Sequence, residues 1–341
     1  MFLSDNTAPA SPEIWRYVEK HAQNGYDLPY GDDILTTQLN DCVSAIFDQQ
    51  VFVFPVLTGT AANCLALGQM CHGRQSIICH PNSHLAVSES TAPQLFTGGA
   101  RLTTLGTDLD RIDSQLLNEY LRALDIKDIH SPPPAVLAIT QATEYGRSYS
   151  CEQINELGEI CRRHQLKYFV DGARFANAVA SIGCHPADLS CRSGVDAMTF
   201  GASKNGTFGA EALVVFDPSL AANIRAHAKQ TGHLASKMRF LSAQLLGYFE
   251  NELWLNNASH ANQMAKLVAD KIVEKGLGTC YFPAQTNQLF VSLSSQQWQS
   301  AKEQGYALYH WPVEGQDCYR LVTSWATKES DVAGFIAAIQ I

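Results

Sequence analysis

The chain has 341 residues, of which 46% are hydrophobic and 17% charged, enough apolar material for a large core in one or two domains. Its formal net charge is −9 and it has no basic run, which argues against nucleic-acid binding but not against a local anion pocket. Apolar runs fall short of the roughly 18 residues of a membrane helix, and the N-terminus does not resemble a signal peptide. The ten cysteines show no Cys-x-x-Cys spacing, so we expect reduced thiols, a cytoplasmic protein and no metal site.

The first 30 residues predict an arm and one helix. Ser11 and Pro12 are typical of a helix N-cap and first helical position. Residues 25–33 are rich in turn formers and predict a loop, and residues 34–47 predict a second helix.

From residue 51 the sequence pattern changes to apolar runs separated by helical patterns. The runs are 51–55, 76–79, 101–105, 135–140, 168–170, 197–200 and 212–216, and helical patterns fall between most of them, notably 109–124 and 151–164. Such strands, without polar alternation, predict a mostly parallel sheet covered on both faces. The last two runs are too close for a crossover helix, so we expect one antiparallel pair there.

The C-terminal part predicts helices over 219–230, 236–252 and 258–275. A smaller α+β unit then follows, with strands at 288–293 and 319–322 and helices at 295–304 and 329–339. We therefore expect an N-terminal arm and helix (1–30) that contributes to the active site, a large domain (31–250) and a small C-terminal domain (251–341). The boundary should fall within helices rather than in a flexible linker.

The segment Thr58-Gly59-Thr60 lies where a strand turns into a helix. Small residues let the backbone approach a phosphate, and a helix N-terminus offers free N–H groups and a positive dipole end. The pattern is not a dinucleotide fingerprint, which favours a single phosphate over a large nucleotide. An ordinary helix cap is the alternative.

Asp171 follows an apolar strand and begins Asp171-Gly172-Ala173-Arg174. Ligands gather at the carboxyl ends of strands in open α/β sheets, and an aspartate there can keep a pyridine nitrogen protonated. Arg174 suits a carboxylate, or it could pair with Asp171. An N-cap role for Asp171 stays open.

Two further residues are candidates for chemistry. His84 lies in another strand-to-helix turn, where an imidazole can stack on a flat ring and act as a base, with His80 as a rival. Lys204 lies between two apolar runs in a turn of small residues, where a desolvated amine can form a Schiff base. By themselves a surface histidine and a solvated lysine remain alternatives.

Taken in order, these motifs resemble the low-specificity L-threonine aldolases, enzymes that depend on pyridoxal 5'-phosphate (PLP) and have the aspartate-aminotransferase fold (fold type I). The resemblance covers nearly the whole chain, and the Ser-Lys-Asn-Gly form at 203–206 is similar to the phenylserine aldolase branch. The matching segments are Ser4-Asp5-Asn6, Tyr30-Gly31-Asp32, Thr58-Gly59-Thr60-Ala61-Ala62-Asn63, His84, Gln141-Ala142-Thr143-Glu144-Tyr145-Gly146, Asp171-Gly172-Ala173-Arg174, Ser203-Lys204 and the ending Tyr319-Arg320-Leu321-Val322-Thr323-Ser324-Trp325-Ala326-Thr327.

The resemblance implies an α/β fold of the PLP-dependent transferase type, with a mostly parallel mixed sheet in the large domain and a small α+β domain. It implies a Schiff base between PLP and Lys204, with Asp171 on the pyridine nitrogen and His84 stacked on the ring and moving a proton. It further implies that Thr58, Gly59, Thr60 and Ser203 bind the cofactor phosphate and that Ser4, Arg174 and Arg320 bind the substrate carboxylate. Arg174 is also expected to contact the phenolic-oxygen side of the cofactor. Tyr30 is expected to reach into the neighbouring subunit's site.

The family assembles as dimers of dimers, so a homodimer or homotetramer with shared active sites is implied. Two positions depart from the family pattern. Residues 141–144 lack the histidine that many members carry, and Lys229 is a weak candidate for a phosphate contact from the partner chain, where many members have basic residues before a Gly-Gly pair.

The implied activity is that of an aldehyde-lyase: retro-aldol cleavage of L-threonine, L-allo-threonine or another β-hydroxy-α-amino acid such as phenylserine, to glycine and an aldehyde. β-Elimination or transamination by another fold-type-I enzyme is the main alternative. A PLP-fold binding module is disfavoured because both Lys204 and Asp171 are present, and a nucleotide-binding protein because the glycine fingerprint is absent.

Overall fold

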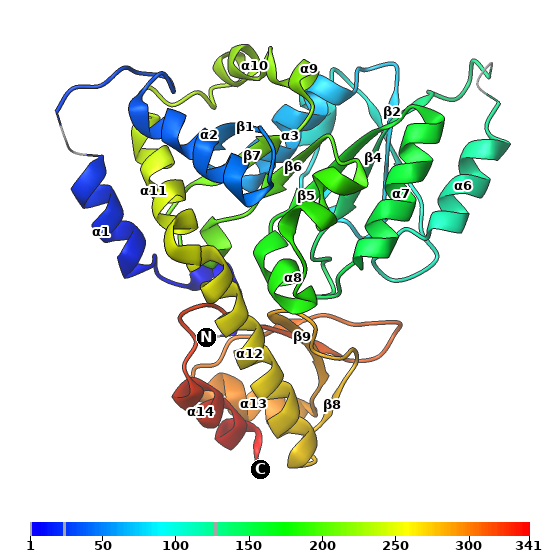
Figure 1. Cartoon of the computed structure of the whole chain (residues 1–341). Coiled ribbons are helices and arrows are strands. Elements are labelled where there is room, and N and C mark those ends of the chain that lie inside the picture. The colour runs from blue at the N-terminus through cyan, green and yellow to red at the C-terminus, as the bar shows by residue number, and fades with distance from the viewer. Residues whose placement is uncertain (1, 23–24, 126–127) are drawn as a thin grey trace.

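A computed structural model describes residues 2–22, 25–125 and 128–341. Its main feature is a seven-stranded sheet with helices on both faces (Figure 1). In spatial order the strands are β1 (Phe52–Val56), β7 (Glu211–Val215), β6 (Ala197–Phe200), β5 (Lys167–Gly172), β4 (Pro134–Thr140), β2 (Ser76–Cys79) and β3 (Arg101–Thr104). Strands β6, β5, β4, β2 and β3 pair in parallel, whereas β7 is antiparallel to both of its neighbours.

The expected antiparallel pair of closely spaced strands is therefore confirmed as β6 and β7. The position of β1 was not predicted: it lies at the sheet edge beyond β7, and because both β1 and β6 are antiparallel to β7, they run in the same direction. The carboxyl ends of β1, β2, β4, β5 and β6 and the start of β7 consequently lie at one edge of the sheet.

The central strands are buried on both faces because successive side chains point to opposite sides. In β5, Tyr168 and Val170 belong to one apolar cluster and Phe169 belongs to another on the opposite face. The same alternation divides β4, where Leu137 packs on one side and Ala138 on the other. This is why the sequence runs are continuously apolar.

Helices α2, α7, α8 and α11 contribute to the first cluster and α3 to the second. The α-helices of this part are α1 (Pro12–His21), α2 (Ile34–Ile46), α3 (Gly59–Met70), α4 (His84–Val87), α5 (Ala92–Phe96), α6 (Ser114–Ala123), α7 (Cys151–His164), α8 (Phe175–Ile182), α9 (Pro218–Ala221), α10 (Ile224–Gln230) and α11 (Arg239–Phe249). Short 3-10 turns are η1 (Asp5–Thr7), η2 (Pro186–Leu189), η3 (Cys191–Ser193), η4 (Ser203–Asn205) and η5 (Glu250–Glu252).

Several expected helix bounds are wrong. The helix expected from residue 109 begins only at Ser114, where the Asp113 side chain caps it by accepting from the Leu116 N–H. The helix expected over 219–230 is broken between α9 and α10, and the one expected from 236 begins at Arg239.

The C-terminal part contains a second, four-stranded antiparallel sheet in the order β10 (Tyr309–His310), β11 (Tyr319–Val322), β9 (Gln288–Ser292), β8 (Thr279–Cys280). Helices α12 (Leu253–Glu274), α13 (Ser295–Glu303) and α14 (Glu329–Ile339) accompany it. The long α12 runs from the end of α11 into this part, and it begins earlier than the predicted residue 258 (Figure 1). Residues Asn251 and Glu252, with φ of 52° and 56°, separate α11 from α12.

The N-terminal arm contacts both parts of the molecule. Phe2 packs in the apolar cluster of the C-terminal sheet and helices, and its carbonyl accepts from the Val322 N–H (2.9 Å). The domain limits at residues 30 and 250 stay a prediction. Among the described helices, none is long and apolar enough to cross a membrane.

Candidate active site

Seven of the predicted residues line one cavity of about 240 Å³ at the carboxyl edge of the large sheet: Thr58, Gly59, Thr60, His84, Asp171, Ser203 and Lys204. They come from the ends of β1, β2, β5 and β6, far apart in sequence. Asn6, Asn63, Glu89 and Glu211 also contribute to the lining. Ser4, Tyr30, Arg174 and Arg320 do not line this cavity.

The phosphate candidate is the start of α3. The Thr58 hydroxyl accepts from the Ala61 N–H (3.1 Å), so this side chain is the N-cap that the sequence also allowed. Gly59 has open space where a Cβ would point, and its backbone lines the cavity with Thr60. The N-terminus of a 12-residue helix thus faces free space, which suits an anion.

Lys204 lies on η4, the turn that follows β6. The turn is held by Glu211 at the start of β7, whose carboxylate accepts from the Ala202 N–H (2.6 Å) and lies near Ser203. Burial raises the pKa of Glu211, partly offset by this N–H and by the nearby Lys204 charge. The polar groups of the turn are therefore fixed by a buried acid.

Asp171 is 2% exposed at the end of β5. Its donors are neutral: the Asn63 amide (2.9 Å) and the Ala173 N–H (3.1 Å). Burial raises the pKa of Asp171, although the charges of His84 and Lys204 act against this. A buried carboxylate with neutral donors favours a cationic partner such as a pyridinium N–H.

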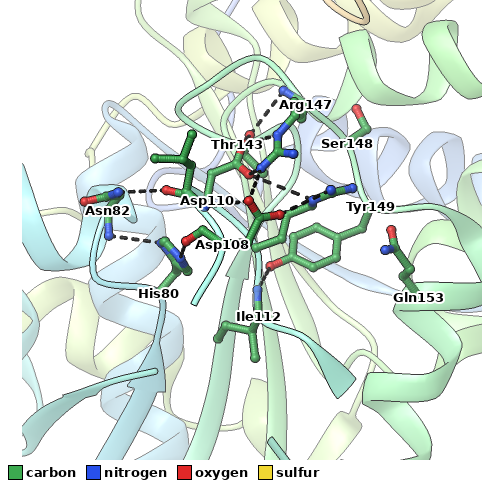
Figure 2. Close-up of polar contacts among 12 residues, drawn as sticks. His80, Asn82, Asp108, Asp110, Ile112, Thr143, Arg147, Ser148, Tyr149 and Gln153 are labelled. Carbon is green, nitrogen blue, oxygen red and sulfur yellow. Dashed lines mark hydrogen bonds and ion pairs between the residues drawn. The ribbon is translucent and has the colours of Figure 1, made fainter. Parts of the chain in front are cut away.

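His84 faces the same cavity, and its Nδ1 lies 2.8 Å from Glu89 Oε1. His80 does not take part. It is 3% exposed, and its Nε2 lies 2.9 Å from the Asp108 carbonyl oxygen. Figure 2 shows His80 in a separate polar cluster with Asn82 and Asp108. The structure thus favours His84 over its rival by position.

The cluster of Figure 2 also fixes the loop after β4. Arg147 pairs with Asp108 and Asp110, and the Thr143 hydroxyl donates to Asp110. Glu144 lies in the turn closed by the Gly146 N–H on the Thr143 carbonyl (3.0 Å). Its charge acts on His84, Asp171, Arg174 and Arg320, so residues 141–144 bring a carboxylate close to these four side chains.

Arg174 does not pair with Asp171, the partner that the sequence offered. It donates instead to Asp5 from Nε (2.8 Å) and Nη2 (2.9 Å), and both side chains are buried. Ser4 precedes this aspartate, and its hydroxyl caps η1 by accepting from the Asn6 N–H (3.2 Å). The arm therefore comes close to the cavity through Asp5, which holds Arg174, and through Asn6, which lines the cavity, while the role expected of Ser4 stays a prediction.

Arg320 lies on β11 with its guanidinium over the rings of Trp311 (4.6 Å) and Tyr309 (4.9 Å). Its Nε is buried and has no hydrogen-bond partner among the described residues. Burial, and then the charge of Arg174, lower the pKa of Arg320. Two neighbouring guanidinium groups, one with an unpartnered buried N–H, have the chemistry that suits a carboxylate.

Tyr30 and Lys229 lie together away from the cavity. The Lys229 ammonium is 4.6 Å from the centre of the Tyr30 ring, and Tyr30 is 37% exposed. Both were expected to act on a neighbouring subunit's site.

The sequence assigned no role to five lining or positioning residues: Asp5, Asn6, Asn63, Glu89 and Glu211. Asp5, Asn6 and Asn63 lie in segments that match the family, and Glu211 immediately precedes the apolar run 212–216. Glu89 lies between exposed neighbours and left no such signal.

The described residues fit PLP. Lys204 offers the amine, α3 offers free N–H groups for a phosphate, and Asp171 offers a buried anion for the ring nitrogen. Fold and site together define a PLP-dependent enzyme of fold type I. The chain belongs to the beta-eliminating lyase family, whose model matches residues 1–296.

Within that family the chain is similar to threonine aldolases. It is 36% identical over 339 residues to a low specificity L-threonine aldolase of a Pseudomonas species, covering 99% of this chain and 96% of the relative. The threonine aldolase structure of Leishmania major superposes with a TM-score of 0.92 at 24% identity, covering 99% of this chain and 98% of that one. A serine palmitoyltransferase of S. paucimobilis with a bound PLP–myriocin aldimine shares the fold, with a TM-score of 0.70 at 12% identity over 96% of this chain and 81% of that one. The expected fold class and family are confirmed.

Proposed function

We propose that the protein cleaves L-threonine, L-allo-threonine or a related β-hydroxy-α-amino acid such as phenylserine to glycine and an aldehyde. The observation that carries the proposal is one cavity that combines Lys204, Asp171 and His84 beside the arginine pair Arg174 and Arg320. The 36% identity to a low specificity L-threonine aldolase over nearly the whole chain supports it.

PLP, held as a Schiff base on Lys204, would supply the electron sink for the breaking Cα–Cβ bond. Asp171 would keep the ring nitrogen protonated. Gly59, Thr60 and Ser203 would hold the phosphate, and Thr58 would cap helix α3, whose free backbone N–H groups face the cavity. Each role is supported by position on the cavity wall.

The substrate carboxylate would bind Arg320 through its unpartnered Nε, next to Arg174 and the Ser4 segment. Arg174 already donates two hydrogen bonds to Asp5, so we assign the larger share of carboxylate binding to Arg320. Fixing the carboxylate orients the bond between Cα and Cβ, which is a positional contribution to the rate.

His84 would take the β-hydroxyl proton as the Cα–Cβ bond breaks and the aldehyde leaves. The glycine α-carbon is then protonated, so the overall reaction consumes no external acid or base. His84 must be neutral to accept this proton, and the Glu89 hydrogen bond raises the pKa of His84 despite its burial. Activity should therefore fall on the acidic side of that raised pKa.

Product analysis tests the activity. We expect acetaldehyde and glycine from L-threonine and L-allo-threonine, and benzaldehyde and glycine from L-phenylserine. The name of the matching family makes β-elimination the second candidate. Ammonia with a keto acid, in place of aldehyde and glycine, would contradict the retro-aldol proposal.

We also propose a cytoplasmic homodimer or homotetramer with shared sites. The exposed large apolar side chains include Leu57, which lines the cavity and is 60% exposed, and the stacked pair Phe208 and Trp15, whose ring centres lie 4.1 Å apart. Tyr30 and Lys229 lie together on another surface, as residues serving a neighbouring site would. All ten cysteines lie in the described ranges and are free, which suits a reducing compartment.

Mixing two inactive variants tests the shared site. Light scattering should report a dimer or tetramer. Subunits carrying Lys204→Ala and subunits carrying Tyr30→Ala, unfolded together and reassembled, should regain part of the activity, because some hybrid sites combine both intact residues. Hybrids without activity would contradict a contribution of Tyr30 across the interface.

A further inference from the structure

We propose that Glu89 is the positioning residue for His84: it holds the imidazole through Nδ1 and leaves Nε2 as the nitrogen that exchanges protons in the cavity. Only one part of the inference rests on the proposed function, namely that Nε2 accepts the proton of the substrate's β-hydroxyl group. The geometry that fixes the imidazole is independent of the reaction.

The contact joins a buried group to a partly exposed one. Glu89 Oε1 lies 2.8 Å from His84 Nδ1, with side-chain exposures of 0% for Glu89 and 34% for His84. Glu89 follows the four-residue α4 on which His84 lies, so the pair is separated by only five positions. The imidazole is thus anchored at one nitrogen while the rest of the ring faces the cavity.

The charge of Glu89 decides which nitrogen carries the proton. Burial alone would raise the pKa of Glu89, but hydrogen bonds from His84, Thr60 and Asn63 outweigh it and hold the pKa below its ordinary value. An ionised carboxylate can only accept hydrogen bonds. Nδ1 must therefore donate, and in the neutral imidazole the lone pair lies on Nε2.

Asn63 locks Glu89 in place. The Thr199 hydroxyl donates to the Asn63 side-chain oxygen (2.6 Å), which fixes the orientation of the amide. The amide nitrogen then donates to Glu89 Oε1 (3.0 Å) and to Asp171 Oδ2 (2.9 Å). One amide therefore sets the spacing between the acid that holds His84 and the acid assigned to the ring nitrogen, and single atoms of His84, Glu89 and Asp171 lie within 4.8 Å of one another.

Three acids act on His84, from three segments. Glu89 makes the direct hydrogen bond and has the largest effect, and Asp171 from β5 and Glu144 from the loop after β4 act through charge. All three raise the pKa of His84, and burial lowers it. Glu144 is therefore a matched comparison for Glu89, because it supplies a charge of the same sign and acts on His84 through charge, whereas Glu89 also makes the hydrogen bond.

The test is histidine NMR of the PLP-loaded enzyme labelled with ¹³C and ¹⁵N in its imidazole rings, with His84→Asn assigning the signals. In the wild type we expect the neutral ring to carry its proton on Nδ1 and to titrate above the ordinary histidine value of about 6.5. In Glu89→Gln the titration should move down by about one pH unit, with mixed tautomers, because the anionic acceptor is lost. Glu144→Gln should shift it less and leave the proton on Nδ1.

An Nε2–H tautomer in the wild type, or equal shifts in Glu89→Gln and Glu144→Gln, overturns the proposal. Glu89→Asp keeps the charge but is one methylene shorter, and its titration should lie between those of the wild type and Glu89→Gln. If Glu89→Gln does not fold, Glu89→Asp replaces it in the test. In that case, a His84 titration in Glu89→Asp that equals that of the wild type refutes the direct contact.

Kinetics separates this inference from the proposed function. The acidic limb of kcat/KM should move down with the NMR titration in Glu89→Gln, while kcat falls because fewer molecules have a free Nε2. If the wild type releases no aldehyde but the NMR shifts occur, the proposed function fails and the positioning role stands. If aldehyde forms and neither titration nor tautomer changes, the positioning role fails alone.

Discussion

Asp5 and Arg174 form a buried bidentate pair, with Arg174 Nε and Nη2 at 2.8 and 2.9 Å from the two carboxylate oxygens. The pair joins the N-terminal arm to the end of β5, and Asn287, just before β9, donates a further hydrogen bond to Asp5 (3.0 Å). Three distant segments thus meet at one carboxylate. The arginine expected to bind substrate is first of all a structural partner of the arm.

Replacing Asp5 should destabilise the fold. Asp5→Asn leaves Arg174 buried without its counterion, which typically costs about 3–5 kcal/mol. Burial opposes ionisation of Asp5, but Arg174 outweighs it and lowers the pKa of Asp5 in the folded state. The pair therefore stabilises the fold above the unfolded pKa of about 3.9, and this contribution is lost as the pH falls through the lower folded value.

Thermal denaturation at several pH values checks this. Asp5→Asn should melt lower near neutral pH and lose less stability on acidification than the wild type. The exposed Asp41→Asn is the control, with a change within about 0.5 kcal/mol. Equal melting of the wild type and Asp5→Asn would show that the arm is held by Phe2 alone.

Lys204→Ala should abolish covalent PLP binding. The purified wild type should be yellow, with the near-visible absorbance of a Schiff base, because Lys204 is the lysine that lines the cavity with Asp171. The variant should lose that band and the activity, whereas the exposed Lys302→Ala should keep both. A wild type that stays colourless with excess PLP would refute the PLP assignment altogether.

His84→Asn should lower turnover without releasing PLP. General-base catalysis contributes about 10²–10⁴-fold, so kcat for aldehyde release should fall by that order while the Schiff-base absorbance remains. The exposed His72→Asn serves as the control. Unchanged turnover in His84→Asn would transfer the base role to water or to another group.

Arg320→Gln should raise KM more than it lowers kcat. A charge-assisted hydrogen bond to the substrate carboxylate is worth about 1.5–3 kcal/mol, so its loss should raise KM by roughly 10- to 100-fold. Arg320→Lys should recover only part of the affinity, because an ammonium lacks the planar fork that stacks between Tyr309 and Trp311. Steady-state kinetics checks this against the exposed Arg122→Gln, and a normal KM in Arg320→Gln would assign the carboxylate to Arg174.

Several parts of this protein followed from the sequence alone. Continuous apolar runs arise from burial on both faces of a sheet, so the strand positions and the mostly parallel class were predictable from residues such as Val136–Ile139. The motifs at the strand ends were predictable for the same reason. The candidate site residues at 58–60, 171 and 204 follow strands that run in the same direction, so they lie at one edge of the sheet. Helix starts were less predictable, because the irregular stretch before Ser114 is fixed by a distant contact, the Tyr149 hydroxyl accepting from the Ile112 N–H (2.7 Å).

Only the tertiary structure decided which polar groups meet. The sequence offered Asp171 as a partner for Arg174 because the two are three residues apart, but the strand end points them differently and Asp5, 169 positions away, fills the guanidinium fork. The site roles of Glu89, Asn63 and Glu211 could not be assigned from the sequence for the same physical reason: hydrogen bonding and burial depend on distances that the chain closes only when it folds. Local periodicity fixes elements, whereas the pairing of buried charges is settled by packing between elements.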